Sequence, residues 1–296
     1  MPRIEVEITH PDRVMFGKNG ITKLDLVDYY GEVADTMLPH LKGRALTVQR
    51  FPRGIGEKGF VQQDFADTLP AWMSGVEVGK EGGTLVHPLA ERPQALRWLA
   101  NQNCITLHVW QSRQGNLHNP DRLVFDLDPS DADFAVVRAT ARTIADVLDD
   151  LGLARYVQTT GSRGLHVVVP IRAEVDFDTV RQFARDVAEV VVADDDAHRT
   201  LEVRKDNRDG RIYLDVMRNA YAQTAVAPYS VRARAGAPVA TPLEWDELDT
   251  RGLRADRFSI RDVPKRIAGQ GDPWADMFRH ARSLTGPLER LAKLRA

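Results

Sequence analysis

RLVFDLDP, residues 122–129, alternates apolar and acidic side chains toward its carboxyl end. This alternation predicts a β-strand, in which residues two apart project from the same face. Asp126 and Asp128 then project together, while Phe125 and Leu127 face the other way. Two adjacent carboxylates repel each other unless a cation lies between them, and their oxygens are ligands that Mg²⁺ or Mn²⁺ accepts. The segment therefore predicts a strand that forms part of a metal site.

A third acidic residue, Asp215, lies in the apolar strand predicted for RIYLDVM, residues 211–217. Three strand carboxylates favour a pair of metal ions about 3.5–4 Å apart, an arrangement suited to in-line attack at phosphorus. For Asp128 alone, an equally good interpretation is that it ends the strand before the turn at Pro129.

TTGSRGLH, residues 159–166, predicts a tight turn between strands at 156–160 and 165–171. Glycines at this turn would let backbone N–H groups approach a phosphate. Hydroxyl, cationic and imidazole groups accompany them: Thr160, Ser162, Arg163 and His166. A plain hairpin turn explains the glycines equally well.

Basic residues surround the Asp215 segment. Arg218 follows it directly, and Arg232 and Arg234 alternate in SVRAR, which predicts a strand with both on one face. These three arginines favour contact with a triphosphate or a nucleic-acid backbone. The arginines and lysine between 199 and 211, Arg208 included, are interpreted as solvated loop charge.

Strand-like and helix-like segments alternate along most of the chain, which predicts a mixed α/β or α+β fold. We expect an N-terminal module at 1–120, a catalytic module at 121–240 and a helical extension at 241–296. Helices are predicted from Leu24 to Leu38, capped by Thr22 and ended by Pro39, and from Asp133 to Leu151, capped by Gly152. A third helix is predicted at 178–192, a strand at 44–51 and a loop at 51–59.

Composition excludes several classes of protein. The 296 residues include 40 Lys and Arg against 42 Asp and Glu, so the net charge of −2 excludes a histone-like basic coat but not a local basic groove. The single cysteine, Cys104, excludes an internal disulfide framework and is expected to be a small buried residue. No apolar run is fit for a signal peptide or a membrane span, which predicts a soluble cytoplasmic protein.

Five motifs occur together in order. They are ITHPDRV with ITKLDLVDYY, RLVFDLDP, TTGSRGLHVVVPI, IYLDVMRN and APYSVRAR. With them the chain resembles, over nearly its whole length, the polymerase domains of the bacterial DNA-repair ligases called LigD, in the archaeo-eukaryotic primase superfamily. The resemblance implies a two-module α/β core whose central sheet is related to the RNA-recognition fold, and template-dependent addition of nucleotides, preferably ribonucleotides, to DNA ends or short gaps in non-homologous end joining.

The resemblance also implies roles for particular residues. Asp126, Asp128 and Asp215 match ligands of two Mn²⁺ or Mg²⁺ ions. Residues matching the nucleotide pocket are His108, Thr160, Ser162, Arg163, His166, Arg218, Arg232 and Arg234. Arg13 and Lys23, with His10 beside them, match residues that recognise a 5′-phosphate of downstream DNA. Phe60 matches an aromatic that packs on the template, but Val61 stands where a second aromatic is frequent.

Neither a K-x-D-G ligase motif nor a histidine-rich nuclease segment is present. A ligase and a Ku-type end-binding protein would therefore act in trans on a monomeric polymerase that DNA holds at the nucleoid. Gap filling in excision repair is the alternative. FDLDPS also imitates the D-x-D motif of haloacid-dehalogenase-type phosphatases, a distant alternative because Asp215 lacks the acidic neighbour that chemistry needs. A third interpretation is a nucleic-acid-binding module without activity, which the intact carboxylates disfavour.

Overall fold

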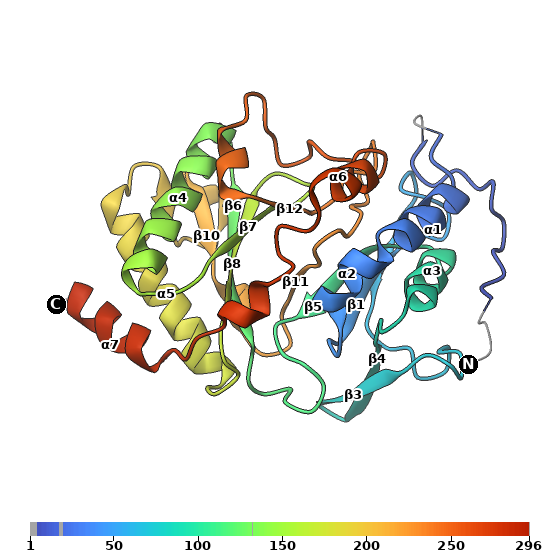
Figure 1. Cartoon of the computed structure of the whole chain (residues 1–296), viewed down its shortest axis with the longest axis horizontal. Helices are drawn as coiled ribbons and strands as arrows, with labels where there is room; N and C mark the ends of the chain where they lie inside the picture. Colours follow the sequence, from blue (N-terminus) through green and yellow to red (C-terminus); the bar gives the residue numbers. More distant parts are fainter. Residues whose placement is uncertain (1–4, 18–19, 132, 296) are drawn as a thin grey trace. The chain divides into compact units, whose positions relative to one another are not determined.

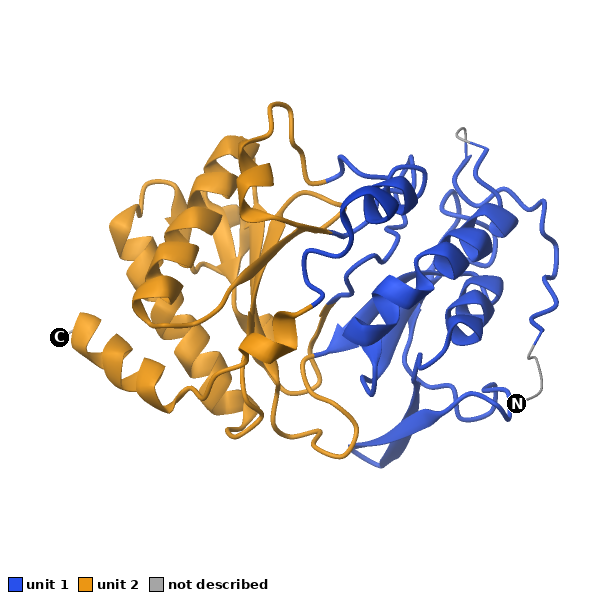
Figure 2. Ribbon diagram, in the orientation of Figure 1, with its two compact units in different colours: residues 1–110, 226–241, 256–275 blue, residues 111–225, 242–255, 276–296 orange. Residues whose placement is uncertain are grey.

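The computed structural model describes residues 5–17, 20–131 and 133–295 (Figure 1). The chain divides into two compact units, each assembled from three separate segments (Figure 2). Unit 1 is Met1–Trp110, Val226–Thr241 and Asp256–Ala275; unit 2 is Gln111–Ala225, Pro242–Ala255 and Asp276–Ala296. This division differs from the three consecutive segments expected from the sequence, because the chain from residue 241 onward contributes to both units.

Unit 1 is built on β5, β1 and β2 of a four-stranded sheet in the order β11-β5-β1-β2. The strands are β11 (Thr224–Val226), β5 (Cys104–Trp110), β1 (Leu46–Arg50) and β2 (Phe60–Gln62). β1 is antiparallel to both neighbours, with Thr47 opposite His108 and Arg50 opposite Phe60. A separate hairpin pairs β3 (Gly75–Lys80) with β4 (Gly83–Pro88).

The helices of unit 1 are α1 (Lys23–Glu32), α2 (Ala34–Leu41), α3 (Pro93–Asn101) and α6 (Val263–Gln270). Thr22 caps α1 as expected, since its hydroxyl accepts from the Asp25 amide while the Asp25 carboxylate accepts from the Thr22 amide. The single helix predicted up to Pro39 was wrong: α1 ends before Val33, and Pro39 lies inside α2. Burial of His40 and Leu41 stabilises the turn of α2 that follows the proline.

Unit 2 is built on a six-stranded sheet in the order β12-β7-β8-β6-β10-β9. Its four central strands are β7 (Tyr156–Thr159), β8 (Leu165–Pro170), β6 (Arg122–Pro129) and β10 (Ile212–Asp215); β12 (Thr241–Leu243) and β9 (Arg199–Thr200) lie at the edges. The four central strands form a β-α-β-β-α-β unit with α4 (Phe134–Asp150) and α5 (Phe177–Asp194), and each of these strands is antiparallel to its central neighbours. The expected RNA-recognition-like topology is thereby confirmed.

Helices α4 and α5 cover one face of this sheet (Figure 1). Phe125 and Leu127 of β6 are fully buried, and their alternation with Asp126 and Asp128 places the two aspartates on the face opposite the helices. Gly152, with a φ of 68°, ends α4 as predicted. The last helix, α7 (Thr285–Leu294), packs on α5. Within the described part of the chain, every helix falls short of the length and apolar character needed to cross a bilayer.

Candidate active site

A row of four polar residues crosses the face of the unit 2 sheet that lies opposite α4 and α5. Strand register places Gln158 of β7 opposite His166 of β8, His166 opposite Asp126 of β6, and Asp126 opposite Asp215 of β10. Residues directly opposite on antiparallel strands share a face and lie close together. The sheet therefore brings together Asp126, Asp215 and His166, which the sequence had marked separately.

The Arg218 side chain contacts the carboxylates of both Asp126 and Asp215. Its Nε is 3.1 Å from Asp126 Oδ2 and 3.3 Å from Asp215 Oδ2. On the other side of Asp126, His166 Nε2 is 3.4 Å from Oδ1, and Gln158 contacts His166 Nδ1 at 3.2 Å. Sequence reasoning missed Gln158, because only strand register places it beside the histidine.

These contacts shift the pKa values of Asp126 and Asp215 in opposite directions. Burial would raise the pKa of Asp126, but His166 and Arg218, by charge and hydrogen bonding, hold that pKa well below its usual range. Burial raises the pKa of Asp215; Arg218 opposes that rise and the charge of Asp126 adds to it. The pair thus depends on a neighbouring cation for its full negative charge.

Asp128 has different partners. Arg163, in the turn between β7 and β8, approaches Asp128 Oδ1 at 3.1 Å, and Arg208 approaches Oδ2 at 3.2 Å. Arg208 is nearly buried; its other nitrogens donate to the backbone carbonyls of Glu202 and Val203, and its guanidinium lies 4.1 Å from the centre of the Tyr213 ring. Its interpretation as solvated loop charge was wrong, because folding brings it to a carboxylate 80 residues away in the chain.

The strand that carries Asp215 is shorter than predicted. β10 ends at Asp215, whose Oδ1 accepts from the Met217 amide at 2.8 Å and starts a 3₁₀ turn at Met217–Asn219. The Asn219 side chain then accepts from the Val124 amide and donates to the Val124 carbonyl, both at 2.8 Å. The Asn219 side chain thus makes the hydrogen bonds to β6 that the backbone of a longer β10 would make. Because Arg218 directly precedes Asn219 in the chain, these bonds help to hold Arg218 beside the carboxylates.

The glycine turn is closed by its own residues. The Gly164 amide donates to Thr160 Oγ1 at 3.2 Å, and the buried Thr160 amide donates to the Gly164 carbonyl at 3.1 Å. A Cβ added at Gly164 would lie 1.7 Å from the Leu127 carbonyl oxygen, so the close approach of β6 requires glycine here. Ser162 is half-buried and Arg163 exposed at the tip of the turn.

The donor set of this face has the chemistry that divalent ions bind: carboxylate oxygens from Asp126, Asp128 and Asp215 on one face of two adjacent strands. Asp126 and Asp215 pair with Arg218. Asp128 pairs with Arg163 and Arg208. Among the residues that the structure describes, no group of three or more His, Cys, Asp and Glu side chains is arranged to hold an ion. Guanidinium groups supply the positive charge instead.

The other expected nucleotide residues belong to unit 1. His108 lies on β5 opposite Thr47 and is half-buried. The strand predicted for SVRAR was wrong: the Arg234 amide donates to the Arg232 carbonyl at 2.8 Å, which makes a turn and ends the alternation. Arg232 is half-buried and Arg234 exposed, so the two do not share a strand face.

The residues expected to bind a 5′-phosphate gather within unit 1. Lys23, at the start of α1, is 1% exposed, and its backbone amide donates to the Arg13 carbonyl at 2.8 Å. Burial, and then the charge of Arg13, lowers the pKa of Lys23 to about 8. The exposed His10 has a φ of 51° in the same segment. Arg13 also donates to the Pro52 carbonyl at 2.7 Å, which connects this cluster to the loop after β1.

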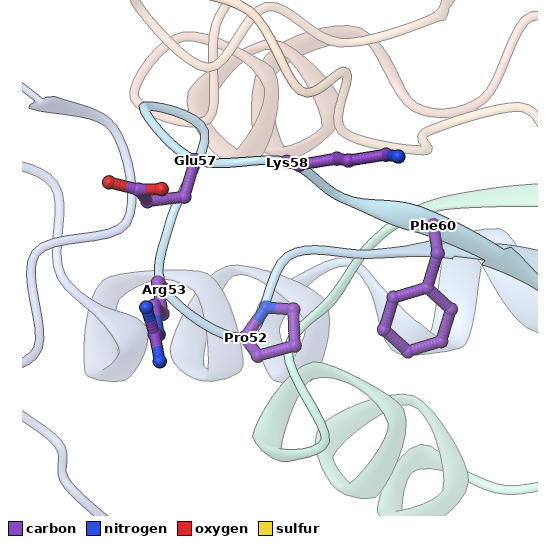
Figure 3. Close-up of a pocket in the computed structure, with 5 residues that line it drawn as sticks. All are labelled: Pro52, Arg53, Glu57, Lys58 and Phe60. Carbon is purple, nitrogen blue, oxygen red and sulfur yellow. The ribbon is translucent and has the colours of Figure 1, made fainter.

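That loop lines an open pocket of about 290 Å³, formed by Pro52, Arg53, Glu57, Lys58 and Phe60 (Figure 3). The Phe60 ring is 48% exposed, with the Arg50 guanidinium carbon 5.6 Å from its centre. Val61 is 60% exposed and, by strand alternation, projects from the other face of β2. An exposed ring beside several cations is a surface on which a nucleobase can stack.

Comparison with known proteins identifies the family. Residues 22–274 match the family model described as LigD, primase-polymerase domain. The chain belongs to the LigD primase-polymerase domain family. That family consists of nucleotidyltransferases of the polymerase and primase type.

Relatives and a solved structure agree with this membership. The multifunctional non-homologous end joining protein LigD of Mycobacterium bovis is 36% identical over 277 residues, which are 90% of this chain and 36% of that protein. The bifunctional LigD of Bacillus subtilis is 32% identical over 294 residues, 98% of this chain and 47% of the relative. The chain thus spans less than half the length of these relatives.

The fold is that of a solved polymerase domain. The polymerase domain of Mycobacterium tuberculosis ligase D in complex with DNA superimposes with a TM-score of 0.88 at 34% identity, covering 94% of this chain and 99% of that one. The mixed α/β fold predicted from the sequence is confirmed.

Proposed function

We propose that this chain is a template-dependent repair polymerase that adds nucleotides to DNA ends or short gaps during non-homologous end joining. The observation that carries the proposal is the row His166–Asp126–Asp215 with Arg218, set on one face of a sheet in a LigD polymerase-family chain. In the proposed reaction, the primer 3′-hydroxyl attacks the α-phosphorus of a nucleoside triphosphate and pyrophosphate leaves.

Asp126, Asp128 and Asp215 are the residues that would hold divalent ions. Two Mn²⁺ or Mg²⁺ ions, when bound, supply charge that lowers the pKa of the 3′-hydroxyl and offsets charge on the departing pyrophosphate. In the described structure Arg218 provides the neutralising charge for Asp126 and Asp215. If bound ions neutralised these carboxylates, the Arg218 guanidinium group would be available to the triphosphate, for which its planar paired N–H donors are well suited.

The remaining pocket residues have supporting roles in this proposal. Arg163 and Ser162, at the tip of the glycine turn, are proposed to contact phosphate oxygens, whereas the buried Thr160 closes the turn by a hydrogen bond. Gln158 fixes the ring of His166, which in turn orients the Asp126 carboxylate. Nucleotide contacts are also proposed for His108, Arg232 and Arg234, which belong to unit 1.

The substrate DNA is proposed to contact unit 1 in two places. A 5′-phosphate of the downstream strand binds at His10, Arg13 and Lys23, where two cations lie together without a carboxylate partner among the described residues. The template packs on Phe60 beside the pocket of Figure 3. A ligase and an end-binding protein of the Ku type are the partners we propose, with ribonucleotides the preferred substrates.

Primer extension tests the proposal directly. The wild-type chain, supplied with Mn²⁺, nucleoside triphosphates and a one-nucleotide gap bearing a 5′-phosphate, is expected to add the nucleotide complementary to the template. Asp126→Asn serves as the matched control because it keeps the shape of the side chain. Extension by the variant at the wild-type rate, or none by the wild type, would refute the assignment.

A further inference from the structure

The segment before α1 is held in place by one side chain from α3. Asn101, the last residue of α3 and 6% exposed, donates from Nδ2 to the Glu7 carbonyl at 2.9 Å. Its Oδ1 accepts from the Thr9 amide at 3.0 Å and from Thr9 Oγ1 at 3.3 Å. The side-chain amide thus pairs with this backbone as a neighbouring strand would, and it fixes the orientation of the Thr9 hydroxyl.

Thr9 in turn receives the ammonium group of Lys23. Lys23 Nζ donates to the Thr9 carbonyl at 2.7 Å and to Thr9 Oγ1 at 2.9 Å. Because the single hydroxyl hydrogen points to Asn101, an oxygen lone pair is available to the ammonium group. Two of the three Lys23 N–H donors are therefore assigned, and the third is directed away from Thr9.

The charge of Lys23 has no anionic partner in the described part of the chain. The side chain is almost completely buried, and the charge that acts on its pKa is the cation of Arg13, which itself donates to the Pro52 carbonyl. Burial of a cation costs free energy unless an anion pairs with it. The Lys23 ammonium group, held by two neutral acceptors, is therefore suited to bind an anion of a ligand.

We propose that Thr9, held by Asn101, is a positioning residue that aims the Lys23 ammonium group at the 5′-phosphate of downstream DNA. The inference rests on the proposed function and assigns part of its specificity to two residues that do not themselves meet the phosphate. Without the Thr9 hydroxyl, the ammonium group would lose one of its two acceptors and would no longer be fixed in direction.

The test compares two variants of the exposed Thr9. Thr9→Ser keeps the hydroxyl, whereas Thr9→Val keeps the shape and removes it. The measured quantity is the ratio of dissociation constants for a gapped duplex with a 5′-hydroxyl and the same duplex with a 5′-phosphate. Thr9→Val should reduce this ratio by about threefold to tenfold, the scale of one ordinary intramolecular hydrogen bond, and Thr9→Ser should keep the wild-type ratio.

A pH series adds a measurement that a purely structural role would not change. The hydroxyl stabilises the protonated ammonium group, so its removal lowers the pKa of Lys23. The pH at which the phosphate preference disappears should therefore fall in Thr9→Val and stay in place in Thr9→Ser. Asn101→Ala, which frees the hydroxyl to rotate, should lose preference in the same direction as Thr9→Val.

The outcomes separate two failures. A wild type that binds both duplexes equally overturns the proposed phosphate site, and with it the role of Thr9. A wild type that prefers the phosphate, with an unchanged ratio and pH midpoint in Thr9→Val and Asn101→Ala, overturns the positioning role alone. Thermal melting of each variant confirms that the compared proteins are folded.

Discussion

Asp126 and Asp215 lie directly opposite each other on the antiparallel strands β6 and β10, and a single guanidinium group, that of Arg218, contacts both carboxylates. Cross-strand carboxylates at this spacing repel each other, so the guanidinium group stabilises the pairing of the two strands. If the proposed function is correct, Arg218 connects the stability of the sheet to the binding of metal and nucleotide.

Replacement of the carboxylates should abolish catalysis. Asp126→Asn, Asp128→Asn or Asp215→Asn should each reduce nucleotide addition by several orders of magnitude, because each removes a proposed metal ligand. Single-turnover extension with Mn²⁺ measures the rate, and gel shift with a gapped duplex serves as the control for DNA binding. A variant that keeps more than about a tenth of the wild-type rate would remove its residue from the proposed metal site.

Arg218→Ala should destabilise the metal-free protein. The side chain is 39% exposed, so a loss of about 1–2 kcal/mol is expected, less than for a fully buried pair. Urea unfolding with and without Mn²⁺ measures the effect. If the carboxylates bind the ion, Mn²⁺ should stabilise Arg218→Ala more than the wild type; equal stabilisation of both proteins would contradict a shared cation position.

Gly164→Ala should disrupt the hairpin of β7 and β8. The added Cβ would meet the Leu127 carbonyl, and β6 would have to move, at an expected cost of about 3–5 kcal/mol. Gly79→Ala, in β3, is the matched control: like Gly164 it lies outside the region of positive φ, but no atom lies within 4 Å of the added Cβ, so a change of no more than about 0.5 kcal/mol is expected. Similar melting temperatures for the two variants would show that β6 and the turn are less closely packed.

The preference for a 5′-phosphate should depend on pH through Lys23. Its pKa of about 8 in the free protein lies below the ordinary value of 10.5, so the side chain is protonated below about pH 8 and loses charge above it. Because a bound phosphate favours the charged form, the preference should be constant near pH 7 and fall at pH values above 8. Duplex binding from pH 6.5 to 9.5 measures this, with Lys23→Ala as control; a preference that persists at pH 9.5 would exclude Lys23.

Nucleotide competition tests the proposed sugar preference. Opposite a templating T, ATP should be incorporated in preference to dATP, since a pocket that hydrogen-bonds the 2′-hydroxyl disfavours the analogue without it. Equimolar ATP and dATP, with products separated by length and alkali sensitivity, give the ratio directly. Preferential incorporation of dATP would contradict the proposal.

Local sequence predicted much of the sheet that holds the site. Alternation in RLVFDLDP gave β6 and the shared face of Asp126 and Asp128, and the glycines of TTGSRG gave the hairpin that places His166. These signals are local, because strand alternation and turn geometry depend on near neighbours. The burial of Cys104 was likewise predicted, and burial raises the pKa of its thiol to about 12.

Contacts between distant segments escaped prediction. Arg208 pairs with Asp128 because the loop before β10 folds back, and nothing in its own neighbourhood signals that contact. Gln158 is an ordinary strand residue until register sets it beside His166. The SVRAR alternation failed for a local reason that was overlooked: Gly236 and Pro238 follow closely and favour a turn.

The discontinuity of both units has a consequence for synthesis. Unit 1 receives its last segment only at Asp256–Ala275, so a nascent chain of 110 residues, although it contains most of that unit, still lacks the partners of α2 such as Asp272, which pairs with His40 at 2.7 Å. Unit 2 is complete only at its final segment, Asp276–Ala296. Each unit can therefore complete its packing only after chain segments beyond residue 255 have been synthesised, and neither can be excised as one continuous fragment.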